Sequence, residues 1–136
     1  MRLTEKTDAA FRILMYLAQS GEIRTSVDTI VAETGAHRSQ VVAAVQVLRK
    51  CGYIFSQTGR LGGIWLAKLP SEITVSEVVQ AMENDFHLAE CFGSSNNCGC
   101  GLSETCKLKP ALKLALCGFL ATLDKITLQD LVAEAA

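Results

Sequence analysis

The strongest constraint on the fold is a change of hydrophobic period near residue 53. Before that point, apolar residues recur at the three- and four-residue spacing of amphipathic helices. After it, two short runs, 53–56 and 63–67, are rich in β-branched and aromatic residues and flank a glycine-rich turn at 57–62. This order predicts several helices followed by one β-hairpin.

Three helices are predicted in the first fifty residues. Each of the first two follows a residue whose side chain can cap a helix, and each ends at a glycine. A short helix, a tight turn and a second helix make a helix-turn-helix unit, and the hairpin directly after it makes a winged helix. The predicted limits are Thr4 (with Thr7 or Asp8 as later alternatives) and Gly21, then Ser26 and Gly35, then a third helix that closes near Gly52.

The expected fold class is mainly α with a small β-hairpin wing: a winged helix-turn-helix plus a long dimerisation helix. The long helix is predicted over 108–123, and its apolar stripe needs a partner, since the alternative is packing on its own domain. We expect a DNA-binding domain with a linking helix at 1–83, a cysteine-rich cluster-binding loop at 84–106, and the dimerisation and C-terminal helices at 107–136. The stripe consists of Leu112, Leu116, Phe119, Leu120 and Leu123.

The charge distribution favours a polyanion as partner. Residues 1–70 contain nine Lys and Arg against five Asp and Glu, whereas residues 71–136 contain four against nine. A basic N-terminal half is compatible with nucleic acid even though the net charge of the chain is −1. No nucleophile–base pair, phosphate loop or paired carboxylate motif indicates an enzyme.

The predicted DNA-binding residues lie at the start of the third helix and at the tip of the wing. A recognition helix enters the major groove with its N-terminal end, which here carries His37, Arg38, Ser39 and Gln40. Arginine suits guanine or a phosphate, glutamine suits adenine, and serine can bond to either base or backbone. Arg60 at the hairpin tip can enter the minor groove or grip a phosphate. The expected partner is therefore double-stranded DNA.

The six cysteines, of which four lie within sixteen residues, indicate a metal or redox site. The N-terminal segment does not resemble an export signal and no apolar run is long enough to span a membrane, so we expect a cytoplasmic protein without a disulfide framework. On spacing alone, zinc and an iron–sulfur cluster are equally compatible with the loop. Cys51 and Cys117, outside the loop, are expected to be small core residues.

Several segments together resemble the Rrf2 family of bacterial repressors, in the same order along nearly the whole chain. They are the opening 1–8, the wing 59–66 (GRLGGIWL), the segment 100–109 and the ending 123–132. The resemblance implies a dimeric winged-helix protein, a pseudo-palindromic operator and an iron–sulfur cluster whose state sets the affinity for DNA. Within the family, the nitric-oxide-sensing members are the most similar.

The resemblance also implies a set of cluster ligands. Cys91, Cys100 and Cys106 match the three family cysteines, with Cys98 as an alternative ligand. Members that sense iron status use a histidine three residues after the last cysteine, where this chain has Lys109. The nitric-oxide-sensing members instead use an aspartate from the partner subunit, which Asp8 matches. Helix capping is the competing role for this carboxylate.

A four-iron (4Fe–4S) rather than a two-iron (2Fe–2S) cluster is expected, and an aerobic preparation can lose it. The expected function is a repressor that nitric oxide releases from DNA. The alternatives are a regulator of the same family that senses iron or cluster status, and a zinc-containing or thiol-redox DNA-binding module.

Overall fold

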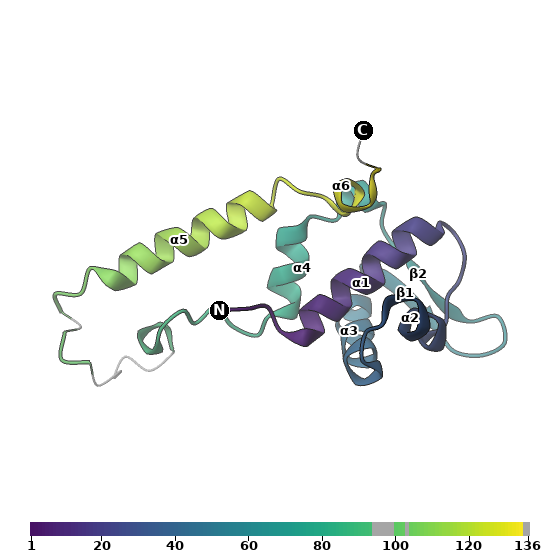
Figure 1. Ribbon diagram of the computed structural model, residues 1–136, viewed down its shortest axis with the longest axis horizontal. Coiled ribbons are helices and arrows are strands. Elements are labelled where there is room, and N and C mark those ends of the chain that lie inside the picture. Colours follow the sequence, from purple (N-terminus) through teal and green to yellow (C-terminus); the bar gives the residue numbers. More distant parts are fainter. Residues whose placement is uncertain (94–99, 103, 135–136) are drawn as a thin grey trace.

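The structure is a computed structural model, and it describes residues 1–93, 100–102 and 104–134. Within these ranges, three helices and an antiparallel hairpin are followed by a linking helix, a long connection, a sixteen-residue helix and a short terminal helix (Figure 1). This confirms the predicted class, mainly α with a β-hairpin wing. The elements are α1 (Glu5–Ser20), α2 (Val27–Thr34), α3 (Arg38–Lys50), β1 (Ile54–Gln57), β2 (Gly63–Leu66), the 3-10 turn η1 (Pro70–Glu72), α4 (Val75–Met82), η2 (Glu90–Phe92), α5 (Leu108–Leu123) and α6 (Leu128–Val132).

Helices α1 and α2 begin where the capping residues predict. The Thr4 side chain, rather than the later alternatives, caps α1 by accepting a hydrogen bond from the N–H of Thr7. The Ser26 hydroxyl accepts one from the N–H of Thr29 at 3.1 Å and starts α2. Gly35 ends α2 in the left-handed conformation with φ of 67°, which turns the chain directly into α3.

The wing is tied to the helical body by an isolated β-bridge. Strands β1 and β2 are antiparallel, with Phe55 opposite Trp65. On the other edge of β2, Ile64 exchanges two backbone hydrogen bonds with Thr25, which lies between α1 and α2. The base of the hairpin is therefore fixed relative to α1 and α2.

The core is built around one face of α1. Ile13 and Leu14 are fully buried and Leu17 is 1% exposed. This face packs against α3, α4 and the hairpin, and also against α6, whose Leu128 is 2% exposed. The last helix thus returns to the winged-helix body, and the backbone N–H of Leu128 donates to the carbonyl of Ile73 at 2.8 Å.

Helix α5 lies apart from this core. It runs away from the winged-helix body (Figure 1, light green), and none of its residues is buried. Leu108, Leu114 and Phe119 are 60%, 75% and 39% exposed. No helix among the described residues is long and apolar enough to cross a membrane.

Two expectations about the cysteines outside the loop are wrong. Cys51 and Cys117 are both exposed rather than buried in the core. Cys51 follows the last turn of α3, whose buried face ends at Leu48, and Cys117 lies on α5, none of whose residues is fully buried within this chain. Apolar character predicted burial, but the position of each residue on its helix decides it.

The start of α1 is capped by a long-range contact, which the local sequence does not predict. The carboxylate of Glu83, directly after α4, accepts hydrogen bonds from the backbone N–H of Thr4 at 2.8 Å and from its hydroxyl at 3.1 Å. It also accepts one from the hydroxyl of Thr7 at 2.5 Å. Partial burial raises the pKa of Glu83, but the bonds from Thr7 and Thr4 and the charge of Lys6 outweigh it. The pKa of Glu83 therefore lies below its ordinary value.

Replacing Glu83 with Gln should destabilise the fold in a pH-dependent way. The substitution removes a negative charge from a helix N-terminus, so we expect the free energy of unfolding at neutral pH to fall by about 1 kcal/mol. Because the folded-state pKa is lowered, the carboxylate contributes this stability above the ordinary glutamate pKa of about 4.3. The contribution disappears as the pH falls through the folded-state value. Urea unfolding from neutral pH to about pH 3, at one protein concentration, measures the difference.

The matched control is Glu22→Gln, an exposed glutamate just after α1. It should leave the free energy of unfolding nearly unchanged at every pH. A loss for Glu83→Gln that stays constant down to about pH 3 would show that the charge of Glu83 is not what stabilises α1.

Candidate nucleic-acid interface and cysteine loop

The four residues predicted to read DNA lie together at the exposed end of α3. His37 occupies the N-cap position with an extended backbone, but its side chain makes no capping hydrogen bond. Arg38 and Ser39 are exposed, and Gln40 is half-buried against α1. Their contact with DNA stays a prediction, but no element of the described chain covers this end of the helix.

An ion pair links the two helices of the helix-turn-helix. A terminal guanidinium nitrogen of Arg38 contacts a carboxylate oxygen of Asp28 on α2. The two side chains are 62% and 77% exposed, so the pair adds little stability in water. Its effect is positional, because Asp28 restrains the guanidinium at the start of α3. A DNA phosphate or guanine would compete with that carboxylate.

The remaining exposed face of α3 was missed by the sequence reasoning. Val42 is 40% exposed, and Gln46, Arg49 and Lys50 are exposed as well. From Ser39, steps of three, four and three residues lead to Val42, Gln46 and Arg49, and Lys50 lies four residues after Gln46. This helical spacing is the signal that could have found them. The face available to DNA therefore extends along the whole helix rather than its first turn alone.

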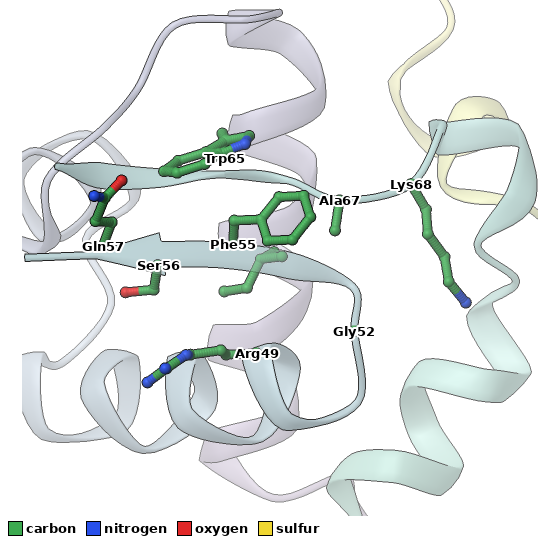
Figure 2. Close-up of a pocket in the computed structure, with 9 residues that line it drawn as sticks. Arg49, Gly52, Phe55, Ser56, Gln57, Trp65, Ala67 and Lys68 are labelled. Atoms are coloured by element: carbon green, nitrogen blue, oxygen red, sulfur yellow. The ribbon is translucent and has the colours of Figure 1, made fainter. Parts of the chain in front are cut away.

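A groove between α3 and the hairpin continues this surface. It has a volume of about 610 Å³, and no acidic residue lines it. Figure 2 shows Arg49 on α3 beneath β1, with Ser56 and Gln57 on the strand above it. Lys68 lies at the far end, with its ammonium 5.0 Å from the centre of the Tyr53 ring. The chemistry of this lining suits a polyanion rather than a cation.

The wing places Arg60 at its tip, as predicted. Arg60 is exposed and lies in the turn between β1 and β2. The wing and α3 therefore present two separate basic side chains, Arg60 and Arg38, from different elements of one body.

The first turn of α1 connects to the turn of the helix-turn-helix. Asp8 and Arg12, one helical turn apart on α1, form an ion pair with the guanidinium Nε 2.8 Å from a carboxylate oxygen. A second nitrogen of Arg12 donates to the carbonyl of Thr34 at 3.0 Å. Thr34 is the last residue of α2, so Asp8 is two contacts away from the turn that sets the direction of α3.

Asp8 and the recognition residues also line one small hollow. Its volume is about 220 Å³, and its lining includes Asp8 and Arg12 from α1 together with His37 and Gln40 at the start of α3. The carboxylate of Asp8 is largely exposed, at 61%. A group from outside this chain can therefore reach it beside the recognition helix.

The predicted cysteine ligands lie in the connection between α4 and α5, whereas Asp8 lies on α1. Cys91 lies in η2 and is half-buried, Cys106 is half-buried, and Cys100 is exposed. Cys98 lies outside the described residues. Among residues 1–93, 100–102 and 104–134, no three histidine, cysteine or acidic side chains form a group that could hold a metal ion. Within one chain, the described ligands are therefore not brought together.

These elements define a winged-helix DNA-binding protein. The family model for Rrf2, described as an iron-dependent transcriptional regulator, matches residues 3–134. The chain therefore belongs to the Rrf2 family of transcriptional regulators. Its relatives are regulators and not enzymes.

Two relatives and one solved structure illustrate the match. The chain is 38% identical to the HTH-type transcriptional regulator NsrR of Bacillus subtilis over 134 residues, which is 97% of this chain and 90% of that protein. It is 40% identical to NsrR of Geobacillus kaustophilus over 137 residues, covering 100% and 92% of the two chains. The structure of T. potens IscR matches with a TM-score of 0.76 at 23% identity, covering 100% and 93%. That structural similarity supports the fold.

Arg38→Ala should weaken DNA binding and relax its sequence preference. An arginine that reads a guanine contributes about 1–3 kcal/mol, so we expect affinity to fall about five- to a hundred-fold. Fluorescence anisotropy with a duplex that the wild-type protein selects from a random pool measures the affinity. Repeating the selection with the variant reports the preference.

Lys125→Ala is the matched control, since this exposed cation lies between α5 and α6, far from α3 along the chain. It should bind the selected duplex as the wild type does. An Arg38→Ala protein with unchanged affinity and preference would remove Arg38 from the reading surface.

Proposed function

We propose that the chain is a cytoplasmic homodimeric repressor that binds a pseudo-palindromic operator and is released from it by nitric oxide, through an iron–sulfur cluster. The observation that carries this proposal is the contact path from Asp8 through Arg12 to the carbonyl of Thr34. It joins a carboxylate suited to ligation with the turn before the recognition helix. The identity to proteins named NsrR supports the same reading.

The described cysteines suit such a cluster chemically. Cys91, Cys100 and Cys106 are free thiols, and none of them is buried. Soft thiolate ligands are those that iron–sulfur clusters require. We assign these three cysteines as ligands, with Cys98 as the alternative for one of them. Asp8 of the partner subunit supplies the fourth, and a bound four-iron cluster would supply iron that reacts with nitric oxide.

The coupling to DNA is made by residues of the chain itself. A carboxylate that ligates iron gives up part of its charge to the metal, so its attraction for Arg12 weakens. Arg12 then has to redistribute between Asp8 and the carbonyl of Thr34, and the position of α3 follows from that carbonyl. Ligation of iron by Asp8 and binding of DNA would thus act on the same element, α3. Allosteric coupling requires an element that both sites influence.

The second subunit is expected along α5. The apolar stripe predicted for α5 is only partly covered within one chain, because Leu112 and Leu116 are half-buried and Phe119 is 39% exposed. Pairing of two α5 helices across a two-fold axis would cover it and would bring Asp8 of one subunit toward the cysteine connection of the other. Two-fold symmetry also accounts for a pseudo-palindromic operator.

One alternative has a specific observation in its favour. The family is described as iron-dependent, which fits a regulator that responds to iron supply or cluster status rather than to nitric oxide. A zinc-containing or thiol-redox DNA-binding module is the other candidate, since the Cys100 thiol is exposed. These two alternatives and the nitric-oxide sensor use the same DNA-binding surface, and they differ in the signal to which the protein responds.

Anaerobic purification should give a brown protein that contains iron and sulfide. We expect a broad visible absorption that bleaches on titration with nitric oxide, in parallel with release of the selected duplex. An iron chelator at the same protein concentration should act more slowly than nitric oxide. Colourless protein that contains zinc, or a duplex affinity that nitric oxide leaves unchanged, would contradict the proposal and favour the thiol module.

Asp8→Ala should separate cluster reactivity from DNA release. Without this carboxylate the link to Arg12 is lost, so the affinity for DNA should depend at most weakly on nitric oxide even where the cysteines still bind iron. Glu5→Ala removes another exposed acid from the same turn and controls for the helix terminus. Nitric-oxide-dependent release that is equal in Asp8→Ala and wild-type protein would exclude the path through Asp8.

A further inference from the structure

The first turn of α2 has a fixed position relative to the start of α3. Ser26 caps α2, and its hydroxyl also shares a hydrogen bond with the hydroxyl of Thr29 at 2.9 Å. Beneath this surface, Ile30 on α2 and Val41 on α3 are fully buried. Gly35 ends α2 in the left-handed conformation and turns the chain into α3. The spacing between exposed side chains on these two turns is therefore set by the packing beneath them.

Asp28, in the first turn of α2, holds one corner of the Arg38 guanidinium. Its carboxylate contacts a single terminal nitrogen, Nη1. A guanidinium carries five N–H donors in one plane, so a carboxylate at Nη1 leaves the edge formed by Nε and Nη2 available. In the part of the chain that the structure describes, this edge makes no hydrogen bond. The side chain of Arg38 is 62% exposed, so a ligand from outside the chain can reach it.

A guanine and a phosphate respond differently to this arrangement. The O6 and N7 atoms of guanine are two acceptors on a neutral base, and they match the two donors of the free edge. A phosphate also matches that edge, but its negative charge is repelled by the carboxylate of Asp28. A guanine that met both terminal nitrogens, Nη1 and Nη2, would instead displace Asp28. The ion pair therefore favours a guanine that meets the Nε edge over any phosphate.

We propose that Asp28 is a positioning residue that makes Arg38 selective for guanine by weakening its attraction for phosphates. The proposal rests on the operator binding proposed above and deepens it, because it assigns sequence preference to a residue that does not itself bind DNA. The charge of Asp28 opposes binding to every DNA sequence, and it opposes binding least where a guanine lies under Arg38. Asp28 thus raises the ratio of operator affinity to non-specific affinity.

Asp28→Ala tests this on two duplexes, one selected by the wild-type protein from a random pool and one of scrambled sequence. The variant should bind the scrambled duplex more tightly. The slope of log affinity against log salt should steepen there by about one, because Arg38 becomes free to engage a phosphate. The ratio of selected to scrambled affinity should fall about five-fold or more. Thermal unfolding followed by circular dichroism checks that the variant is folded.

Glu33→Ala is the matched control. Glu33 is an exposed acid on the same helix, and it takes part in none of the ion pairs found among the described residues. Removing its charge should leave the ratio of selected to scrambled affinity unchanged, because Glu33 restrains no reading residue. In the Arg38→Ala background, Asp28→Ala should also leave this ratio unchanged, since Asp28 acts through Arg38.

A modified base identifies the partner of Arg38. Replacing one guanine of the selected duplex by 7-deazaguanine removes the N7 acceptor from the major groove and leaves the base pair intact. At one guanine of each half-site, the wild-type protein should lose about five-fold or more in affinity. Asp28→Ala should lose less at that position, and Arg38→Ala should lose nothing.

Three results overturn the proposal while operator binding stands. The first is a ratio of selected to scrambled affinity that Asp28→Ala leaves unchanged or that Glu33→Ala lowers equally. The second is an equal effect of Asp28→Ala with and without Arg38. The third is indifference of the wild-type protein to 7-deazaguanine at every position. If the wild-type protein selects no duplex, operator binding itself fails and the role of Asp28 fails with it.

Discussion

The burial of one face of α1 is the constraint on which the other parts of this protein depend. Ile13, Leu14 and Leu17 are almost completely removed from solvent, and each such side chain contributes about 1.5–3 kcal/mol relative to an exposed one. Around them pack α3, which carries the predicted reading residues, the hairpin, and the helices α4 and α6 that border the long connection and α5. Any displacement of α1 would therefore also displace the DNA-binding surface.

From this central position, the polar side of α1 makes contacts in two directions. Its first turn is closed by Glu83 through Thr4 and Thr7, and Glu83 is also the last residue before the connection that leads to the cysteines. Four residues after Thr4, Asp8 pairs with Arg12, which bonds to the end of α2. The start of one buried helix thus contacts the residue that precedes the cysteine connection on one side and the helix-turn-helix on the other. A ligand bound at Asp8 would act on an element that cannot shift without moving its neighbours.

Local chemistry explains how much of the fold could be predicted from the sequence. Thr4, Ser26, Gly21 and Gly35 define helix ends because each acts on the backbone within four residues of itself. The hairpin follows from a period change that is also local. The hydrogen bonds from Thr4 to Glu83, from Arg12 to Thr34 and from Arg24 to Leu61 span 79, 22 and 37 residues, and no pattern in the sequence indicates such pairs. The exposure of Cys51 and Cys117 was missed for a related reason, since residue type alone does not say which side of a helix faces the core.

The candidate site divides in the same way. The predicted reading residues could be placed because the start of a recognition helix is a defined position in a winged helix, whereas the exposure of Arg49 is seen only in the structure. The cysteines could be identified by clustering, but in the proposed function their joint geometry depends on a second subunit, and a sequence contains no record of that arrangement. This difference has a physical basis: the DNA-binding surface is built on helices with buried faces, whereas Cys91 and Cys106 are half-buried and Cys100 is exposed.

Under the proposed function, a ligand held by these cysteines would have to supply the free energy that brings them together. The packed helices around α1 would then convert the gain or loss of that ligand into a difference in affinity for DNA.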